Sequence, residues 1–245
     1  MKLAIFDIGS NDGLDGIVLA YLNPKSFIYS FEPNTELNKK IILNKKRIEK
    51  FFKVKIYNHK VYNYAVSNKN KYQNFYINNH DLLSSLEKIN KNFKNKDDLN
   101  IKRVFKTKVT RLDKFCTKEK IDYIQYLHSD TQGSDLKVLQ GLGTYRNKLI
   151  SGVIETSVDN KTSRYIKACN LSDVKKKLKI WNFRIIKINP NFTDIEYDVY
   201  FTNKKVYENI PQVKTKYNQR FFRRIILKKV KLKDHFTKLF LKLIT

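Results

Sequence analysis

A glycine-containing turn follows directly after the first apolar run of the chain. Residues 3–8 are apolar apart from Asp7, and Gly9, Asn11 and Gly13 then occupy alternate positions. Because glycine has no Cβ, a turn of this kind lets the backbone approach a ligand closely. An apolar strand pattern that passes through such a turn into a helix predicts a nucleotide-type site at the end of the strand.

A carboxylate ends the second predicted strand. The apolar run 27–31 is followed by Glu32, and an acid roughly 20 residues after the turn can hold both hydroxyls of a ribose. The dinucleotide fingerprint has glycine where this chain has Asn11, and Asp7 adds a negative charge that suits an ammonium and a sulfonium better than phosphates. The pattern favours S-adenosylmethionine over a dinucleotide, although an ordinary strand-turn-helix without a ligand can also produce it.

Further polar groups follow two later predicted strands. Asp130 comes after the run 121–128, and Glu155 ends the run 150–154. Methyl transfer to a hydroxyl requires alignment of the acceptor and removal of its proton, so Asp130 is the candidate for orienting or deprotonating that hydroxyl. His128 lies two residues earlier on the same strand face, and it is either the alternative proton acceptor or a core histidine.

Acidic side chains could also bind a metal ion or cap a helix. Asp130 and Glu155 could share a divalent cation, but two carboxylates are too few to predict a metal site. Asp113 is expected to cap the helix that precedes the fourth strand.

The composition restricts the class of protein. A chain of 245 residues with 41% hydrophobic residues predicts one domain with appendages. The net charge of +27 suits a nucleic acid or an anionic membrane, or else a solvated lysine-rich surface. Two cysteines without metal-ligand spacing suit a reducing cytoplasm. The early first strand and the lack of an apolar run of ~20 residues predict a cytoplasmic protein, soluble or peripheral to the inner membrane surface.

The predicted elements alternate between strands and helices, as in parallel βαβ units. Strands are expected at 3–8, 27–31, 61–66, 121–128 and 150–154, and helices at 14–22, 35–52 and 135–142. Residues 183–188 and 197–201 flank a short turn, which predicts an antiparallel hairpin. The fold class is therefore α/β, a doubly wound, mostly parallel sheet ending in an antiparallel hairpin, which is typical of Rossmann-like class I methyltransferases.

Two segments fall outside this alternation. Residues 69–107 form a polar insertion, interpreted as a lid over the carboxyl ends of the strands or as an unstructured loop. The chain is divided into a domain at 1–205 and a basic amphipathic tail at 206–245, which binds an anionic membrane or packs on its own domain or on a second subunit. The helical stripe of the tail is Ile225, Leu232, Phe236, Leu239 and Leu243.

Taken together, the motifs resemble the FkbM-type methyltransferases. They occur in the order of that family, in blocks at 6–13, 31–34, 63–67, 84–86, 109–113, 127–136 and 152–155. The resemblance implies a class I fold, S-adenosylmethionine as methyl donor, and O-methylation of a hydroxyl, often on a sugar, a glycan or a secondary metabolite.

The resemblance also assigns roles to residues. It gives cofactor contacts to Asp7, Gly9, Asn11, Gly13 and Glu32, places Ala65 and Val66 near the adenine, and puts Ser85, Asp130 and Glu155 on the substrate side. The chain departs from the family pattern at Gln132, where an acid is frequent. It also begins at the first strand, so the insertion, a second subunit of a homo-oligomer or the tail is expected to close the pocket.

Two other functions remain open. The first is a polyanion-binding protein, with RNA as its ligand, whose lysines and tyrosines contact the backbone and stack on bases. The second keeps the methyl donor but transfers the methyl group to nucleic acid.

Overall fold

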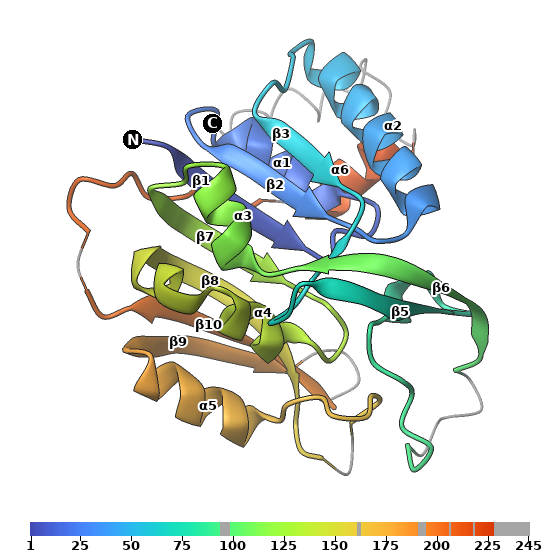
Figure 1. Cartoon of the computed structure of the whole chain (residues 1–245). Coiled ribbons are helices and arrows are strands. Elements are labelled where there is room, and N and C mark those ends of the chain that lie inside the picture. The colour runs from blue at the N-terminus through green and yellow to red at the C-terminus, as the bar shows by residue number, and fades with distance from the viewer. Residues whose placement is uncertain (94–98, 161–162, 191–194, 206, 218, 228–245) are drawn as a thin grey trace.

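A seven-stranded sheet runs through the middle of the molecule (Figure 1). The computed structural model describes residues 1–245 except 94–98, 161–162, 191–194, 206, 218 and 228–245. The strands are ordered β3-β2-β1-β7-β8-β10-β9, and β10 runs antiparallel to both of its neighbours. Their bounds are Leu3–Ile8 for β1, Phe27–Phe31 for β2, His59–Tyr62 for β3, Tyr123–Ser129 for β7, Leu149–Ser157 for β8, Phe183–Pro190 for β9 and Glu196–Asn203 for β10.

This topology confirms the predicted fold class, including the final hairpin formed by β9 and β10. The carboxyl ends of β1, β2, β7 and β8 meet at one edge of the sheet, because these strands are parallel. Since β10 runs the other way, its first residue, Glu196, reaches that same edge. Ligands of doubly wound folds bind at this edge.

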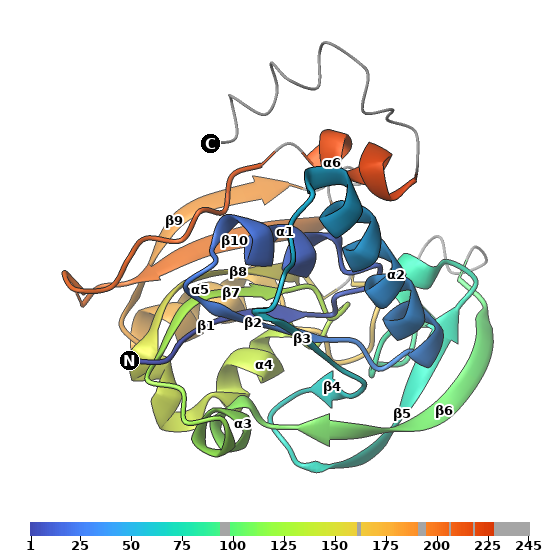
Figure 2. The same ribbon diagram turned by 90° about the horizontal axis from the view of Figure 1, so that it is seen from above.

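Helices cover both faces of the sheet. Helices α1 (Leu14–Leu22), α2 (Thr35–Phe52) and α6 (Gln219–Ile226) lie on one side, whereas α3 (Leu112–Lys118) and α4 (Asp135–Gly141) lie on the other (Figure 2). Helix α5 (Leu171–Ile180) packs against β9. Ile5 and Ile28 point into the core beneath α1, and Phe6 and Phe31 point into the opposite core around Phe115.

The expected cap of α3 is not found at Asp113. The residue at the N-cap is Arg111, and Asp113 lies in the first turn of the helix. The guanidinium of Arg111 binds both carboxylate oxygens of Asp113. That ion pair lowers the pKa of Asp113 despite its partial burial. The Asp113 carboxylate therefore binds Arg111 and does not cap the helix.

The segment at 69–107 is an ordered ribbon over most of its length. Strand β5 (Lys71–Asn78) pairs antiparallel with β6 (Ile101–Thr110), and the two-residue strand β4 (Ala65–Val66) completes a three-stranded sheet. We call β5, β6 and the described residues between them the β5–β6 ribbon (Figure 1). The expected strand at 61–66 is thus divided between β3 in the large sheet and β4 in the small one.

The first part of the basic tail packs on the domain. Phe222, Ile225 and Ile226 of α6 are buried in the core formed by α1 and α2. Of the predicted stripe, Ile225 therefore faces the protein, and Leu232, Phe236, Leu239 and Leu243 lie outside the described residues. Within the described part of the chain, the helices are too short or too polar to cross a membrane.

Candidate active site

A cavity of about 260 Å³ opens at the edge where the carboxyl ends of the parallel strands meet. Gly9, Asn11 and Glu32 line it next to β1 and β2, and Asp130 and Glu155 line it next to β7 and β8. The β5–β6 ribbon supplies part of the wall through Phe75, Leu82, Leu83, Ser84 and Leu86. The cavity therefore joins most of the predicted cofactor residues to Asp130 and Glu155 of the predicted acceptor side.

Glu32 is the buried acid at the nucleoside end of the cavity. Its side chain is 4% exposed, and its oxygens accept hydrogen bonds from the backbone N–H of Asn11 at 3.0 Å and of Asn34 at 2.8 Å. Burial, together with the negative charges of Asp7 and Asp130, outweighs the lowering effect of these two bonds and raises the pKa of Glu32 to about 7. The carboxylate is thus oriented at the cavity wall before any ligand arrives.

The turn after β1 approaches the turn after β7 very closely. A Cβ at Gly9 would lie 1.9 Å from the carbonyl oxygen of Asp130, so only glycine fits at this position. Gly9 and Asn11 both have positive φ, at +79° and +49°. These conformations place both residues on the cavity wall, as the sequence predicted.

Apolar side chains form the remaining wall of the nucleoside end. Phe31, Leu37, Ala65 and Val66 line it beside Glu32. An apolar slot next to a fixed carboxylate matches an adenosyl group, whose base is flat and whose ribose carries two hydroxyls. The residues present therefore fit the nucleoside half of S-adenosylmethionine.

Asp7 and Gly13, for which the sequence predicts cofactor contacts, do not line this cavity. The Asp7 carboxylate is buried towards α1, where it accepts from Ser30 Oγ at 2.9 Å and bonds His128 Nδ1 at 3.0 Å. A Cβ at Gly13 would lie 2.6 Å from the side chain of Ile41, so this glycine lets α1 approach α2. Both residues support the turn and do not reach into the cavity.

His128 likewise lies outside the cavity lining. Burial lowers its pKa, but the hydrogen bond to Asp7 and the charges of Asp15, Asp7 and Asp130 outweigh that effect and raise the pKa to about 10. An imidazole that already carries its proton at neutral pH cannot accept another. The structure thus favours the reading of His128 as a core histidine with a fixed partner over that of a proton acceptor.

The other end of the cavity holds two carboxylates that share one amide. Nε2 of Gln132 donates to Asp130 Oδ1 at 2.7 Å and to Glu155 Oε2 at 2.9 Å. Asp130 is exposed on the cavity side, and Glu155 is half-buried in the cavity wall. Burial raises the pKa of both acids, and the negative charge of Asp130 adds to the effect on Glu155. Each is therefore a stronger base than an ordinary carboxylate.

The residues that hold this carboxylate pair were not among the predicted site residues. Gln132 was noted only as a departure from the family pattern, yet its backbone is turned at φ +56° and its side chain amide joins the two acids. The hydroxyl of Tyr165 bonds Gln132 Oε1 at 3.1 Å and Leu83 O at 2.7 Å. Arg164 forms an ion pair with Glu196, and both line the cavity. Glu196 could have been predicted from the hairpin, because a strand that runs antiparallel to the others begins at the edge where they end. Arg164 belongs to no recognisable sequence motif.

Ser85, which the sequence places on the substrate side, is fully buried and does not line the cavity. Its hydroxyl donates to the carbonyl oxygen of Gln132 at 2.6 Å and accepts from the backbone N–H of Glu87 at 2.9 Å. Its neighbour Ser84 lines the cavity instead. In the part of the chain that the structure describes, no group of three or more histidine, cysteine, aspartate or glutamate side chains is arranged to hold a metal.

A match to a protein-family model identifies the family of proteins to which this site belongs. The model described as the methyltransferase FkbM domain matches residues 7–166, more than half of the chain and all of the cavity lining except Glu196. The chain belongs to the FkbM methyltransferase family. The methyl donor of this FkbM protein is S-adenosylmethionine, in agreement with the residues at the nucleoside end of its cavity.

A solved structure of an FkbM methyltransferase shows the same fold, and a second structure is more distantly similar. An FkbM methyltransferase from Methylobacillus flagellatus is 14% identical with a TM-score of 0.50, and the match covers 82% of this chain and 43% of that one. The M. capricolum TrmK structure with S-adenosyl-homocysteine is 13% identical with a TM-score of 0.46, covering 86% of this chain and 66% of that one. This FkbM chain thus spans less than half of the first structure and about two thirds of the second. A comparison with curated proteins gave no match.

Proposed function

We propose that the protein methylates a hydroxyl group of a saccharide. The observation that carries the proposal is the pair of Asp130 and Glu155, joined by Gln132 in the same cavity as Glu32. In the sheet order, β1 and β7 separate β2, which ends before Glu32, from β8, which carries Glu155. This separation leaves room for a donor between the two ends and for an acceptor beside the carboxylates.

Asp130 is the proposed base. When bound, S-adenosylmethionine supplies a methyl group that is already activated by its sulfonium. Asp130 would accept a hydrogen bond from the acceptor hydroxyl, align the oxygen for in-line attack on the methyl carbon, and take the proton as the new O–C bond forms and the C–S bond breaks. The raised pKa of Asp130 favours this role, because a weaker acid has a stronger conjugate base.

The charge of the acceptor end favours a neutral, polyhydroxylated acceptor. Asp130, Glu155 and Glu196 line this end with three carboxylates, and the cation of Arg164 is paired with Glu196. Carboxylates and the amide of Gln132 can bond the neighbouring hydroxyls that a sugar presents. Phosphate groups would be repelled here, so the cavity supports a saccharide better than a nucleic acid, although the chain as a whole is cationic.

Binding and turnover of two variants test this proposal. S-adenosylhomocysteine is titrated calorimetrically into the wild type, Glu32→Ala and Asp130→Asn. We expect Glu32→Ala to weaken binding by at least about tenfold, because charged hydrogen bonds contribute about 1.5–3 kcal/mol each. Asp130→Asn is expected to bind normally and to lose about 100-fold or more in turnover.

Turnover is followed as S-adenosylhomocysteine release with a panel of neutral saccharides and with RNA oligonucleotides. Turnover with saccharides and not with RNA is the expected result. Wild-type affinity of the Glu32→Ala variant would show that the ribose contact is misplaced, and full turnover by Asp130→Asn would remove the proposed base.

A further inference from the structure

A hydrogen-bonded contact links the C-terminal part of the chain to the turn that forms the cofactor end of the cavity. Nη1 of Arg223, on α6, donates to Oδ2 of Asp12 at 2.6 Å. Asp12 lies between Asn11, which lines the cavity, and Gly13, the N-cap of α1. We propose that residues 211–217 and 219–227 support this turn, residues 9–13, and that Arg223 is a positioning residue for cofactor binding.

Asp12 is held from three directions. Its Oδ1 accepts from the backbone N–H of Leu14 at 3.2 Å, and its carbonyl oxygen accepts from Asn44 Nδ2, on α2, at 2.9 Å. The remaining carboxylate oxygen is the one that Arg223 binds. The Asp12 side chain is only 10% exposed, so Arg223 provides the countercharge for a carboxylate that is largely removed from water.

The helix that carries Arg223 is firmly attached to the domain. Phe222 is fully buried and contacts the rings of Tyr21 and Phe52. Ile225, two residues after Arg223, is buried in the same core, and Nη1 of Arg47 on α2 bonds the carbonyl oxygen of Ile226 at 2.6 Å. Attachment on both sides of Arg223 fixes its direction towards Asp12.

The segment before α6 is attached to α1 in the same way. Asn23, which follows α1, bonds both the N–H and the carbonyl of Lys214, at 2.9 and 3.1 Å. The hydroxyl of Tyr217 donates to the carboxylate of Asp15, in the first turn of α1. The segment therefore contacts α1 at its beginning, at its end and at the turn before it.

The effect on the cofactor passes through Asn11. The backbone N–H of Asn11 bonds Glu32 Oε2, and Asn11 has a left-handed conformation that costs free energy for a residue other than glycine. Fixing Asp12 on one side keeps Asn11 in this conformation, with its N–H directed at Glu32. Without Arg223 the turn has more conformations available in the free protein, and binding of the donor must order it.

The first test measures binding of S-adenosylhomocysteine, which requires no acceptor. Arg223→Ala is compared with Arg224→Ala, a matched control that removes the same charge from an exposed position on the same helix. We expect the Kd to rise about fivefold in Arg223→Ala and to stay unchanged in Arg224→Ala. Arg223→Lys, which can still reach Asp12 with one donor, is expected to recover part of the loss.

A double-mutant cycle separates positioning from a general loss of stability. Asp12→Asn is combined with Arg223→Ala, and all variants are titrated at a temperature where circular dichroism shows them folded. If Arg223 acts through Asp12, the second substitution adds little to the first. Losses that simply add, or an unchanged Kd in Arg223→Ala, would overturn the proposal, whatever the nature of the acceptor.

Discussion

The buried carboxylate of Asp7 and the half-buried imidazole of His128 form a pair that joins β1 to β7 close to the cofactor turn. Ser30 Oγ donates to Asp7 and also contacts His59 Nε2 at 2.8 Å. Since the single proton of Ser30 goes to Asp7, His59 must donate through Nε2. Burial and the charge of Lys45 lower the pKa of His59 to about 4, so His59 is neutral at pH 7. Of the two histidines linked through Asp7 and Ser30, His128 is the one that carries a charge.

This pair predicts a specific pH dependence of stability. The pKa of His128 is about 10 in the folded protein, whereas the ordinary pKa of a histidine, expected in the unfolded chain, is 6.5. Between these two pH values the folded state therefore binds more protons than the unfolded state. The free energy of unfolding should therefore fall as pH rises from about 6.5 to about 10. The pKa of Asp7 is lowered, and its contribution is lost only when the pH falls below its ordinary value of 3.8.

Urea unfolding at pH 7 and pH 10 measures this effect. His128→Gln should be less stable than the wild type by about 3 kcal/mol at pH 7, because Asp7 loses its buried countercharge. Its stability should also change less between the two pH values. His80→Gln, at an exposed position, is the control. If His128→Gln retains the wild-type pH dependence, a different group titrates in this window.

At the scale of elements, the β5–β6 ribbon is attached to the turn after β7. Residues 83–87 form the contact. The hydroxyl of Tyr165 donates to the carbonyl oxygen of Leu83, and the hydroxyl of Ser85 donates to that of Gln132. Glu87 Oε1 accepts from Ser134 Oγ at 2.8 Å and from Lys137 Nζ at 2.6 Å. Because Gln132 in turn bonds Asp130 and Glu155, the position of the ribbon and the geometry of the acceptor end depend on each other.

Ser85 and its neighbour Ser84 provide a matched pair for testing this attachment. Ser85→Ala should lower the free energy of unfolding by about 1–2 kcal/mol, because the buried carbonyl of Gln132 and the N–H of Glu87 lose their partner. It should also raise the KM for the acceptor and leave the Kd for S-adenosylhomocysteine unchanged. Ser84→Ala, facing the cavity, should cost less than about 0.5 kcal/mol. A larger stability loss in Ser84→Ala would show that the attachment is misassigned.

The elements that the sequence predicted well are those with continuous apolar runs. Strands β1 and β2 are buried on both faces, so their composition alone identifies them. The β5–β6 ribbon was missed because most of β6 is exposed on one face or both, and its lysines break up the apolar pattern. Glu32 was predictable because a strand end fixes its position. The role of Gln132 was not, since it depends on a left-handed backbone and on contacts with a distant segment.

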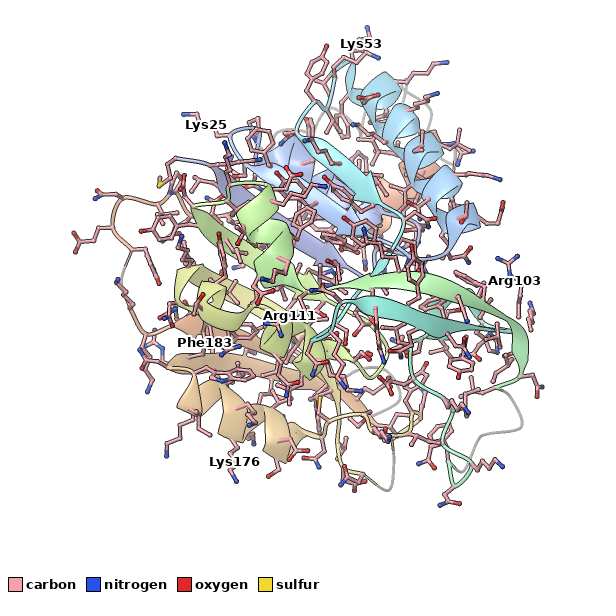
Figure 3. All side chains as sticks on the ribbon, in the orientation of Figure 1. Lys25, Lys53, Arg103, Arg111, Lys176 and Phe183 are labelled. Carbon is pink, nitrogen blue, oxygen red and sulfur yellow. The ribbon has the colours of Figure 1, made fainter. Side chains whose placement is uncertain are left out.

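At the scale of the whole molecule, positive charge is spread over the surface while negative charge gathers at the cavity. Exposed cationic side chains occur on many elements, including Lys53 after α2, Arg103 on β6 and Lys176 on α5 (Figure 3). The positive net charge of the chain thus does not reflect the charge of the site, whose lining holds four carboxylates and one arginine. A cationic surface of this kind attracts polyanions without sequence preference, mainly by releasing counterions.

We accordingly expect RNA to bind the surface independently of the methyl donor. Binding of a fluorescent RNA oligonucleotide should weaken by about 100-fold or more between about 50 mM and about 200 mM salt. Over the same range, the Kd for S-adenosylhomocysteine should change by less than about threefold, because its main contact is a buried carboxylate. Saturating RNA should leave that Kd unchanged as well, and Glu32→Ala should bind RNA as the wild type does. If RNA instead displaces S-adenosylhomocysteine, or itself receives the methyl group, then the polyanion enters the cavity despite its carboxylates, and the acceptor is a nucleic acid.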